Sequence, residues 1–307
     1  MTIEVLAVLF LLLSVGGCKS REGETPTRGE LTVLASESLA PILREEADAF
    51  MSVYPESRIS VHEVDTREAI VALLNDSVSF IATDRKFNAE EQRVADKAQP
   101  DLEELYIARD ALALLVQADN TLEEISMETL GAIMRAEIRE WESLPASRLT
   151  GTIELVLTGK NSGAYELLKD HFFGLDGEIP VFATLSTQRE VKGYVSHHPG
   201  AIGLVSAACL KDTTGQSPGE EAPRMVRSLA FTGVDSTGQK ASYGFYQAYV
   251  HLGKYPLNYP VYICLNDSKS ALGAGFSAFI ASAPGQKIIL DWGLVPVTMP
   301  VRLVQLN

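Results

Sequence analysis

Leu31-Thr-Val-Leu-Ala-Ser-Glu-Ser-Leu-Ala-Pro41 is the stretch of sequence that decides the fold. Leu31–Leu34 reads as a short apolar strand, and small polar residues follow it. From Leu39 to Tyr54 the apolar residues recur at helical spacing, and Pro55 ends that pattern. Ile59–Val64 then alternates apolar and polar residues as a second strand. A strand, helix and strand in this order predict a parallel sheet with a right-handed crossover.

The same alternation continues along the rest of the chain. Tyr106–Val116 is a long extended segment, with enough length to run between two lobes. The chain therefore reads as an α/β protein. Further strands are expected at Val78–Ala82, Ile153–Leu157, Ala201–Ser206 and Val261–Leu265, and further helices at Ile70–Leu74, Ser126–Met134, Ala164–Phe173, Glu190–Ser196, Gly275–Ala283 and Gly285–Trp292.

Composition narrows the class of partner. The chain has 307 residues, of which 46% are hydrophobic and 21% charged, so it can bury a substantial core. Its net charge of -14 argues against nucleic acid or an anionic membrane surface as a partner. A small oxyanion is still compatible with this charge, because local backbone N–H groups can hold it.

The start of the chain resembles a bacterial lipoprotein signal. An apolar run from Ile3 to Val15 leads into Gly16-Gly17-Cys18, and it is too short to span a bilayer as a mature helix. In such signals the cysteine thiol takes a lipid before cleavage. An ordinary secretory signal with a chance cysteine is the alternative. We expect residues 1–17 to be a signal peptide and Cys18 to be the lipidated first residue of the mature chain.

The other two cysteines leave two readings open. Cys209 and Cys264 both lie in apolar, strand-like surroundings. An exported protein permits a disulfide between them, whereas two buried free thiols are the simpler reading. No cysteine and histidine cluster has zinc-ligand spacing, so we expect neither a metal nor another cofactor.

Three loops share one design, in which a strand ends, small polar residues follow and a helix begins. They are Ala35–Leu39, Asp65–Glu68 and Lys160–Ala164. In an open α/β sheet such loops lie at the carboxyl ends of the strands, where ligands bind. Helix starts offer unpaired N–H donors, so three converging loops predict an anion site. Taken singly, each loop is also an ordinary helix cap, and Asp65–Glu68 resembles a capping box.

An ordered set of short motifs resembles the phosphate-binding lipoproteins of ABC-type phosphate transporters. The set covers nearly the whole mature chain in the family's order. It comprises the opening segment Leu31–Pro41, Phe50–Pro55, Val78–Arg85, Asn120–Trp141, Lys160–Ala164, Pro199–Gly203, Tyr255–Leu257, Pro284–Lys287 and Gly293–Pro296.

The resemblance implies a set of ligand-binding residues. The first loop would supply the Ser38 hydroxyl and the Leu39 N–H, and the second loop the Thr66 hydroxyl. Asp84 takes the place of an aspartate that accepts a proton from hydrogen phosphate in some members, and Arg85 that of an arginine found in others. The third loop falls on Ser162, Gly163 and Ala164, where the family's last hydroxyl is lost. The family's arginine falls on Thr158, and Arg85, Arg67 or Lys160 would have to replace it.

The resemblance also implies an architecture and a role. It predicts a two-lobed periplasmic-binding-protein fold, in which each lobe is a mostly parallel sheet flanked by helices. Two segments, near Ala108 and His251, would cross between the lobes. We expect a flexible tether over 18–29, lobe one over 30–108 and 252–307, and lobe two over 109–251. The role would be that of a monomeric, lipid-anchored protein outside a bacterial cytoplasmic membrane, in the periplasm or at the cell surface, which delivers phosphate to ABC permease subunits.

Two other functions stay open at this point. One is a diverged paralogue that binds a different small oxyanion or serves as a sensor. The other is an exported hydrolase, but the sequence has neither a Gly-x-Ser-x-Gly nor a His-Glu-x-x-His motif. We therefore expect a binding protein and not an enzyme.

Overall fold

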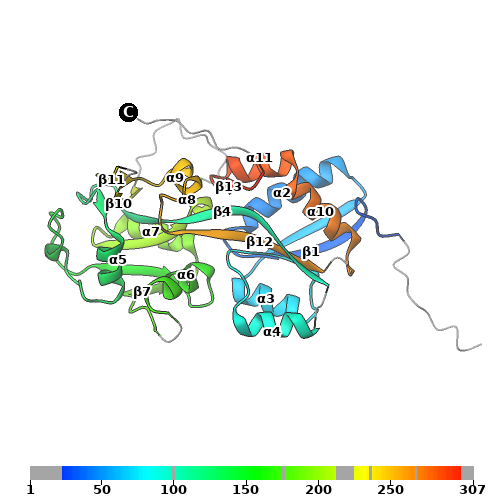
Figure 1. Cartoon of the computed structure of the whole chain (residues 1–307), viewed down its shortest axis with the longest axis horizontal. Helices are drawn as coiled ribbons and strands as arrows, with labels where there is room; N and C mark the ends of the chain where they lie inside the picture. Colours follow the sequence, from blue (N-terminus) through cyan, green and yellow to red (C-terminus); the bar gives the residue numbers. More distant parts are fainter. Residues whose placement is uncertain are drawn as a thin grey trace, which may run out of the picture.

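The computed structural model describes residues 23–98, 101–174, 177–211, 225–234, 237–266 and 268–298 (Figure 1). The expected signal peptide, Cys18 and residues 18–22 of the expected tether lie outside this range. Residues 23–29 are not a free tether. The Glu24 carboxylate accepts hydrogen bonds from Ser270 Oγ at 2.9 Å and Leu272 N at 3.1 Å, which fixes this segment to the start of a helix near the end of the chain.

The first group of strands forms as the opening segment predicts. β1 (Gly29–Ala35) lies between the parallel strands β2 (Ser57–Glu63) and β3 (Phe80–Thr83). α2 (Ala40–Val53) and α3 (Thr66–Leu74) make the crossovers. α2 begins with proline at its first turn and buries Ile42, Leu43 and Phe50, the residues that gave the sequence its helical spacing. α4 (Ala89–Ala98) follows β3.

The second group repeats this plan. β6 (Glu154–Thr158) lies between β7 (Ala183–Leu185) and β8 (Ala201–Ser206), and all three are parallel. The helices α6 (Gly163–Phe172) and α7 (Gln188–His197) lie between them in the sequence. The remaining elements are β5 (Glu124–Ile125), α5 (Met127–Met134), the 3-10 turn Trp141–Ser143, α8 (Ala207–Leu210), β9 (Val226–Ser228), β10 (Ala230–Val234), β11 (Lys240–Tyr243), α9 (Gln247–His251), α10 (Ala271–Ala281), α11 (Ala283–Asp291) and β13 (Val295–Pro296).

The two groups are joined by long antiparallel strands. β4 (Leu102–Gln117) pairs with β12 (Asn258–Asn266) over its first part, and with β8 and β9 over its last part. Figure 1 shows β4 and β12 running side by side between the two groups of elements. The predicted α/β class, with helices flanking mostly parallel strands, is therefore confirmed. Two separate sheets were expected, but the hydrogen-bonded path continues through β4 because this strand pairs at both ends. The lobe limits stay a prediction.

The structure also describes the two remaining cysteines and a buried tryptophan. Cys264 is buried, Cys209 is half-buried, and both are free thiols, so the disulfide reading is wrong. Trp141 is fully buried and its indole N–H donates to Gly200 O at 3.0 Å, which fixes the Pro-Gly-Ala-Ile-Gly turn. Within the described residues, no helix has the length and apolar character needed to cross a membrane.

Candidate functional site

A cavity of about 190 Å³ lies where the three predicted loops meet. Residues from both groups of strands line it. The first group contributes Ser36, Glu37, Ser38, residues 63–66 and Asp84, and the second contributes Thr158, Ser162, Gly163 and residues 186–188. Five of the eight predicted ligand residues therefore lie in one lining. They are Ser38, Thr66, Asp84, Ser162 and Gly163.

The first loop is a tight turn that places its serines inward. Ser36 O accepts the N–H groups of Leu39 at 2.9 Å and Ala40 at 2.8 Å, where α2 begins. The hydroxyls of Ser36 and Ser38 are both buried and lie 3.1 Å apart. Leu39 does not line the cavity, and its N–H, which was expected to bind the ligand, already donates to Ser36 O.

Asp84 is the buried acceptor of the site. It follows β3, its side chain is only 4% exposed, and its Oδ1 accepts the Thr66 hydroxyl at 2.7 Å. Burial raises the pKa of Asp84, and the hydrogen bonds from Thr66 and from Ser38 oppose that shift. Thr66 starts α3 after Asp65, whose side chain makes no capping bond, so the expected capping box does not form.

The third loop approaches Asp84 from the other group of strands. Ser162 caps α6 by accepting Tyr165 N at 3.2 Å, and its hydroxyl lies 2.8 Å from the Thr158 hydroxyl. A Cβ added to Gly163 would lie 2.0 Å from Asp84 Oδ1, so the loop can approach this closely only because residue 163 is glycine. Ala164 is buried and lies outside the lining.

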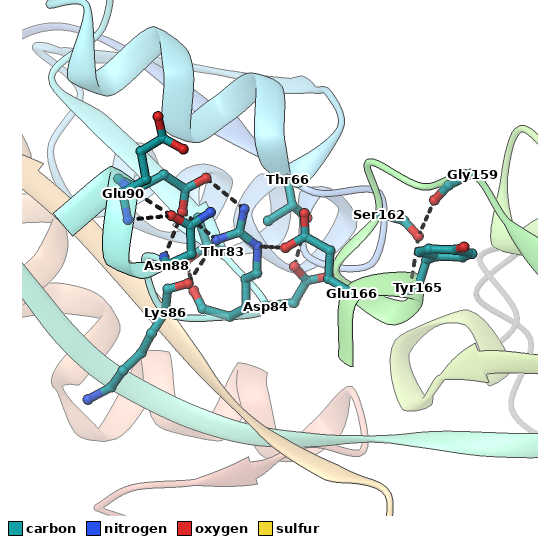
Figure 2. A network of polar contacts seen from close by, with 12 residues as sticks. Thr66, Thr83, Asp84, Lys86, Asn88, Glu90, Gly159, Ser162, Tyr165 and Glu166 are labelled. Carbon is teal, nitrogen blue, oxygen red and sulfur yellow. Dashed lines mark hydrogen bonds and ion pairs between the residues drawn. The ribbon is translucent and has the colours of Figure 1, made fainter. Parts of the chain in front are cut away.

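Arg85 lies next to the cavity but does not line it. Its guanidinium makes two hydrogen bonds with Glu91, at 2.7 and 2.9 Å, and its Nε pairs with Glu166 of α6. Figure 2 shows this network, with Glu166 lying beside Asp84. Burial lowers the pKa of Arg85, but its glutamate partners raise it by more, so it stays charged. Its charge is therefore shared between two carboxylates before any ligand arrives.

The electrostatics of the lining differ from the sequence expectation. Four acidic residues, Glu37, Glu63, Asp65 and Asp84, take part in it, and it contains no lysine or arginine. Thr158, which stands where the family has arginine, contributes a hydroxyl instead. The cavity therefore offers hydroxyl donors and carboxylate acceptors, a set that suits a small ligand with O–H groups. Among the described residues, no cluster of three or more histidine, cysteine, aspartate or glutamate side chains could hold a metal ion.

Glu37 is a cavity residue that the sequence analysis did not single out. Its carboxylate accepts the backbone N–H groups of Gln188 and Arg189, at 2.7 and 3.3 Å. These donors are separated from Glu37 by 151 and 152 positions. Because no local pattern in the sequence marks a contact over that separation, only the folded chain could reveal it.

Comparison with known proteins finds relatives over most of the chain. The family model for the PBP superfamily domain matches residues 20–284. The phosphate-binding protein PstS of Pseudomonas aeruginosa is 22% identical over 295 residues, which cover 89% of this chain and 84% of that protein.

Solved structures share the fold at low sequence identity. An ABC-type phosphate transport receptor from Vibrio cholerae superposes with a TM-score of 0.65 at 21% identity, covering 88% of this chain and all of that one. A structure from Clostridium perfringens with bound phosphate, assigned as a phosphate ABC transporter substrate-binding protein, gives 0.73 at 19% identity with the same coverage. Since the family model spans most of the described residues, this chain belongs to the PBP superfamily-domain family.

Proposed function

We propose that this protein is an extracytoplasmic solute-binding protein that binds phosphate in the cavity and delivers it to an ABC transporter. One observation carries the proposal: a buried carboxylate, Asp84, lies among the hydroxyls of Ser38, Thr66 and Ser162. The relatives named above, whose names or bound ligand refer to phosphate, support the same ligand class.

The chemistry follows from what each group can do. The hydroxyls of Ser38, Thr66 and Ser162 lie at three different helix starts. The Thr66 hydroxyl donates to Asp84 and the Ser162 hydroxyl to Gly159 O, so each donates to a ligand oxygen only by turning away from that acceptor when the ligand binds. Asp84 repels a bare anion, so its place is reasonable only for a ligand that brings a proton to donate. Hydrogen phosphate has that proton and sulfate lacks it. A site built around a ligand O–H rejects an analogue without it, because the buried acceptor is left unpaired.

Calorimetric titration of the purified protein with phosphate and with sulfate tests the proposal. We expect stoichiometric heat with phosphate, no turnover, and weaker binding of sulfate by at least about tenfold. Equal affinity for the two anions would remove Asp84 from the recognition of the ligand. The absence of heat with phosphate would refute the proposed ligand.

A second candidate is a paralogue that binds another small oxyanion. It is favoured by the acidic lining and by Thr158 in the place of the family's arginine, since phosphate sites commonly use a bidentate arginine. A thermal-shift screen distinguishes the two, because a ligand that binds only the folded protein raises its melting temperature. Phosphate, sulfate, arsenate, molybdate, phosphonates and small carboxylates are the ligands to compare.

The membrane anchor is a separate part of the proposal. Cys18, which lies outside the described residues, would carry the lipid. Cys18→Ser should prevent acylation because a hydroxyl cannot replace the acylated thiol. We expect the variant to remain an uncleaved precursor or to leave the membrane fraction. A variant that partitions into detergent as the wild type does would refute the anchor without affecting the ligand.

A further inference from the structure

Glu37 connects the two sides of the cavity. It lies between Ser36 and Ser38 in the first loop, whose serine hydroxyls face the cavity. Its two carboxylate oxygens each accept a backbone N–H from the start of α7, which belongs to the second group of strands. One residue therefore joins a loop of the proposed ligand site to a helix on the opposite wall.

The start of α7 is arranged so that two N–H groups are left for this carboxylate. Thr187 Oγ1 accepts Glu190 N at 3.1 Å, and the Glu190 carboxylate reaches back to Thr187 N at 3.2 Å, which completes a capping box. The N–H groups of Gln188 and Arg189 have no acceptor within that box. Glu37 supplies one, and its negative charge lies at the positive end of the helix dipole.

The contact is anchored on the far side. The Gln188 side chain is 4% exposed, and its Oε1 accepts Ser206 N at 2.6 Å, at the end of β8. The first turn of α7 is thereby tied to β8, which pairs with β6 and with the long strand β4. Glu37 is therefore linked through the start of α7 to a strand of the second group, and not only to a surface loop.

The groups that face Glu37 shift its pKa in opposite directions, and the upward shift from burial prevails. Burial raises the pKa of Glu37, and Glu63 adds to that shift. The N–H groups of Gln188 and Arg189 and the charge of Arg189 lower it. Opening the contact would remove the N–H donors that compensate for the buried charge.

We propose that Glu37 is an interlobe clasp, which couples occupation of the cavity next to Ser38 to closure of the two walls. A ligand bound to the Ser38 hydroxyl holds the first loop in place, and the neighbouring carboxylate then holds α7. The inference rests on the proposed function only for the ligand used in its test.

The direction in which ligand affinity changes when Glu37 is replaced distinguishes a clasp from simple electrostatic repulsion. A carboxylate on the wall of an anion site would weaken binding by its charge, so its removal would strengthen binding. A clasp predicts the opposite, because its removal favours the open protein, which binds less well. Hydrogen bonds to a charged acceptor imply a loss of affinity of about 10- to 100-fold.

The experiment compares Glu37→Ala, Glu37→Gln and a control, Glu68→Gln. Glu68 is an exposed carboxylate in the first turn of α3, outside the cavity lining, so its replacement removes the same charge without touching α7. Titration with phosphate should give about 10- to 100-fold weaker binding for Glu37→Ala, an intermediate loss for Glu37→Gln, and a change below about threefold for the control. Unchanged or stronger binding by Glu37→Ala would overturn the clasp.

Small-angle scattering provides a second readout that needs no ligand. Without phosphate, Glu37→Ala should have a larger radius of gyration than the wild type. A cooperative melting transition of the variant shows that it is folded. If wild type gives no heat with phosphate, the proposed function fails while this readout still tests the clasp. Equal radii for the two proteins would refute it.

Discussion

Replacing Glu46 with glutamine should change how the stability of this protein depends on pH. Glu46 lies on the buried face of α2 and its side chain is fully buried. Neither of its carboxylate oxygens has a hydrogen-bond partner among the described residues. Burial, with a smaller contribution from the charge of Glu45, raises the pKa of Glu46 from 4.5 to about 8. The folded protein therefore holds this group as the neutral acid at neutral pH.

The sign and size of the effect follow from linkage between protonation and folding. Below pH 4.5 the Glu46 carboxyl is protonated in both the folded and the unfolded state, so its ionisation does not change the free energy of unfolding. As the pH rises, the unfolded chain ionises first and is stabilised, so the free energy of unfolding falls until the pH passes about 8. At 1.36 kcal/mol per pKa unit, the loss is about 3 kcal/mol at pH 7 and about 4 kcal/mol at pH 8.

Glu46→Gln removes the titration and keeps the shape of the side chain. We expect the variant to be less dependent on pH than wild type, and more stable by about 3 kcal/mol at pH 7. Glu46→Met should be more stable still, since it also removes the unpaired polar atoms. Asp48→Asn, an exposed substitution on the same helix, is the control and should leave the pH profile unchanged.

Urea unfolding followed by tryptophan fluorescence between pH 5 and pH 8 measures these differences, because Trp141 and Trp292 are both buried. Subtracting the variant profile from that of wild type isolates Glu46 from other raised carboxyls such as Asp110, whose pKa burial raises to about 7. Parallel profiles for wild type and Glu46→Gln would refute the reasoning, because they would mean that Glu46 ionises equally in both states.

Three further predictions concern the site. Gly163→Ala should weaken phosphate binding more than about tenfold, because its Cβ would lie 2.0 Å from Asp84 Oδ1, and wild-type affinity by calorimetry would contradict the close approach. Asp84→Asn should narrow the gap between phosphate and sulfate affinities, measured by titration of each anion, and an unchanged ratio would argue against proton recognition. Arg85→Met should lower the free energy of unfolding by about 3 kcal/mol at pH 7, since it leaves Glu91 and Glu166 without their cation. Burial raises the pKa of Glu91, but its bonds with Arg85 and Asn88 lower it by more, so the pair is fully stabilising above the ordinary carboxylate pKa. The effect of Arg85→Met in denaturant unfolding should therefore shrink as the pH falls from that value through the lowered pKa of Glu91.

Local patterns in the sequence predicted most of the elements around the site, but not the short strand β7 that precedes residues 186–188. The alternation in Ile59–Val64 and the helical spacing after Leu39 correspond to β2 and α2, because each depends on which residues of one short segment face the core. The helix expected over Ser126–Met134 forms as α5, and the Ser126 hydroxyl caps it by accepting Thr129 N at 3.0 Å. The antiparallel pair β10 and β11 had no such signal in its short, partly exposed strands.

By itself, the sequence determined that strand ends, small polar residues and helix starts would meet at one edge of an α/β sheet. It also determined that Ser38, Thr66, Ser162 and Gly163 would lie on those loops, because loop positions follow from local periodicity and chain order. Asp84 was expected at the site only from the family resemblance. Only the tertiary structure decided the electrostatics. Arg85 is held by Glu91 and Glu166, and Glu37 reaches the start of α7, because ion pairs and hydrogen bonds between distant residues depend on distances that local patterns do not contain.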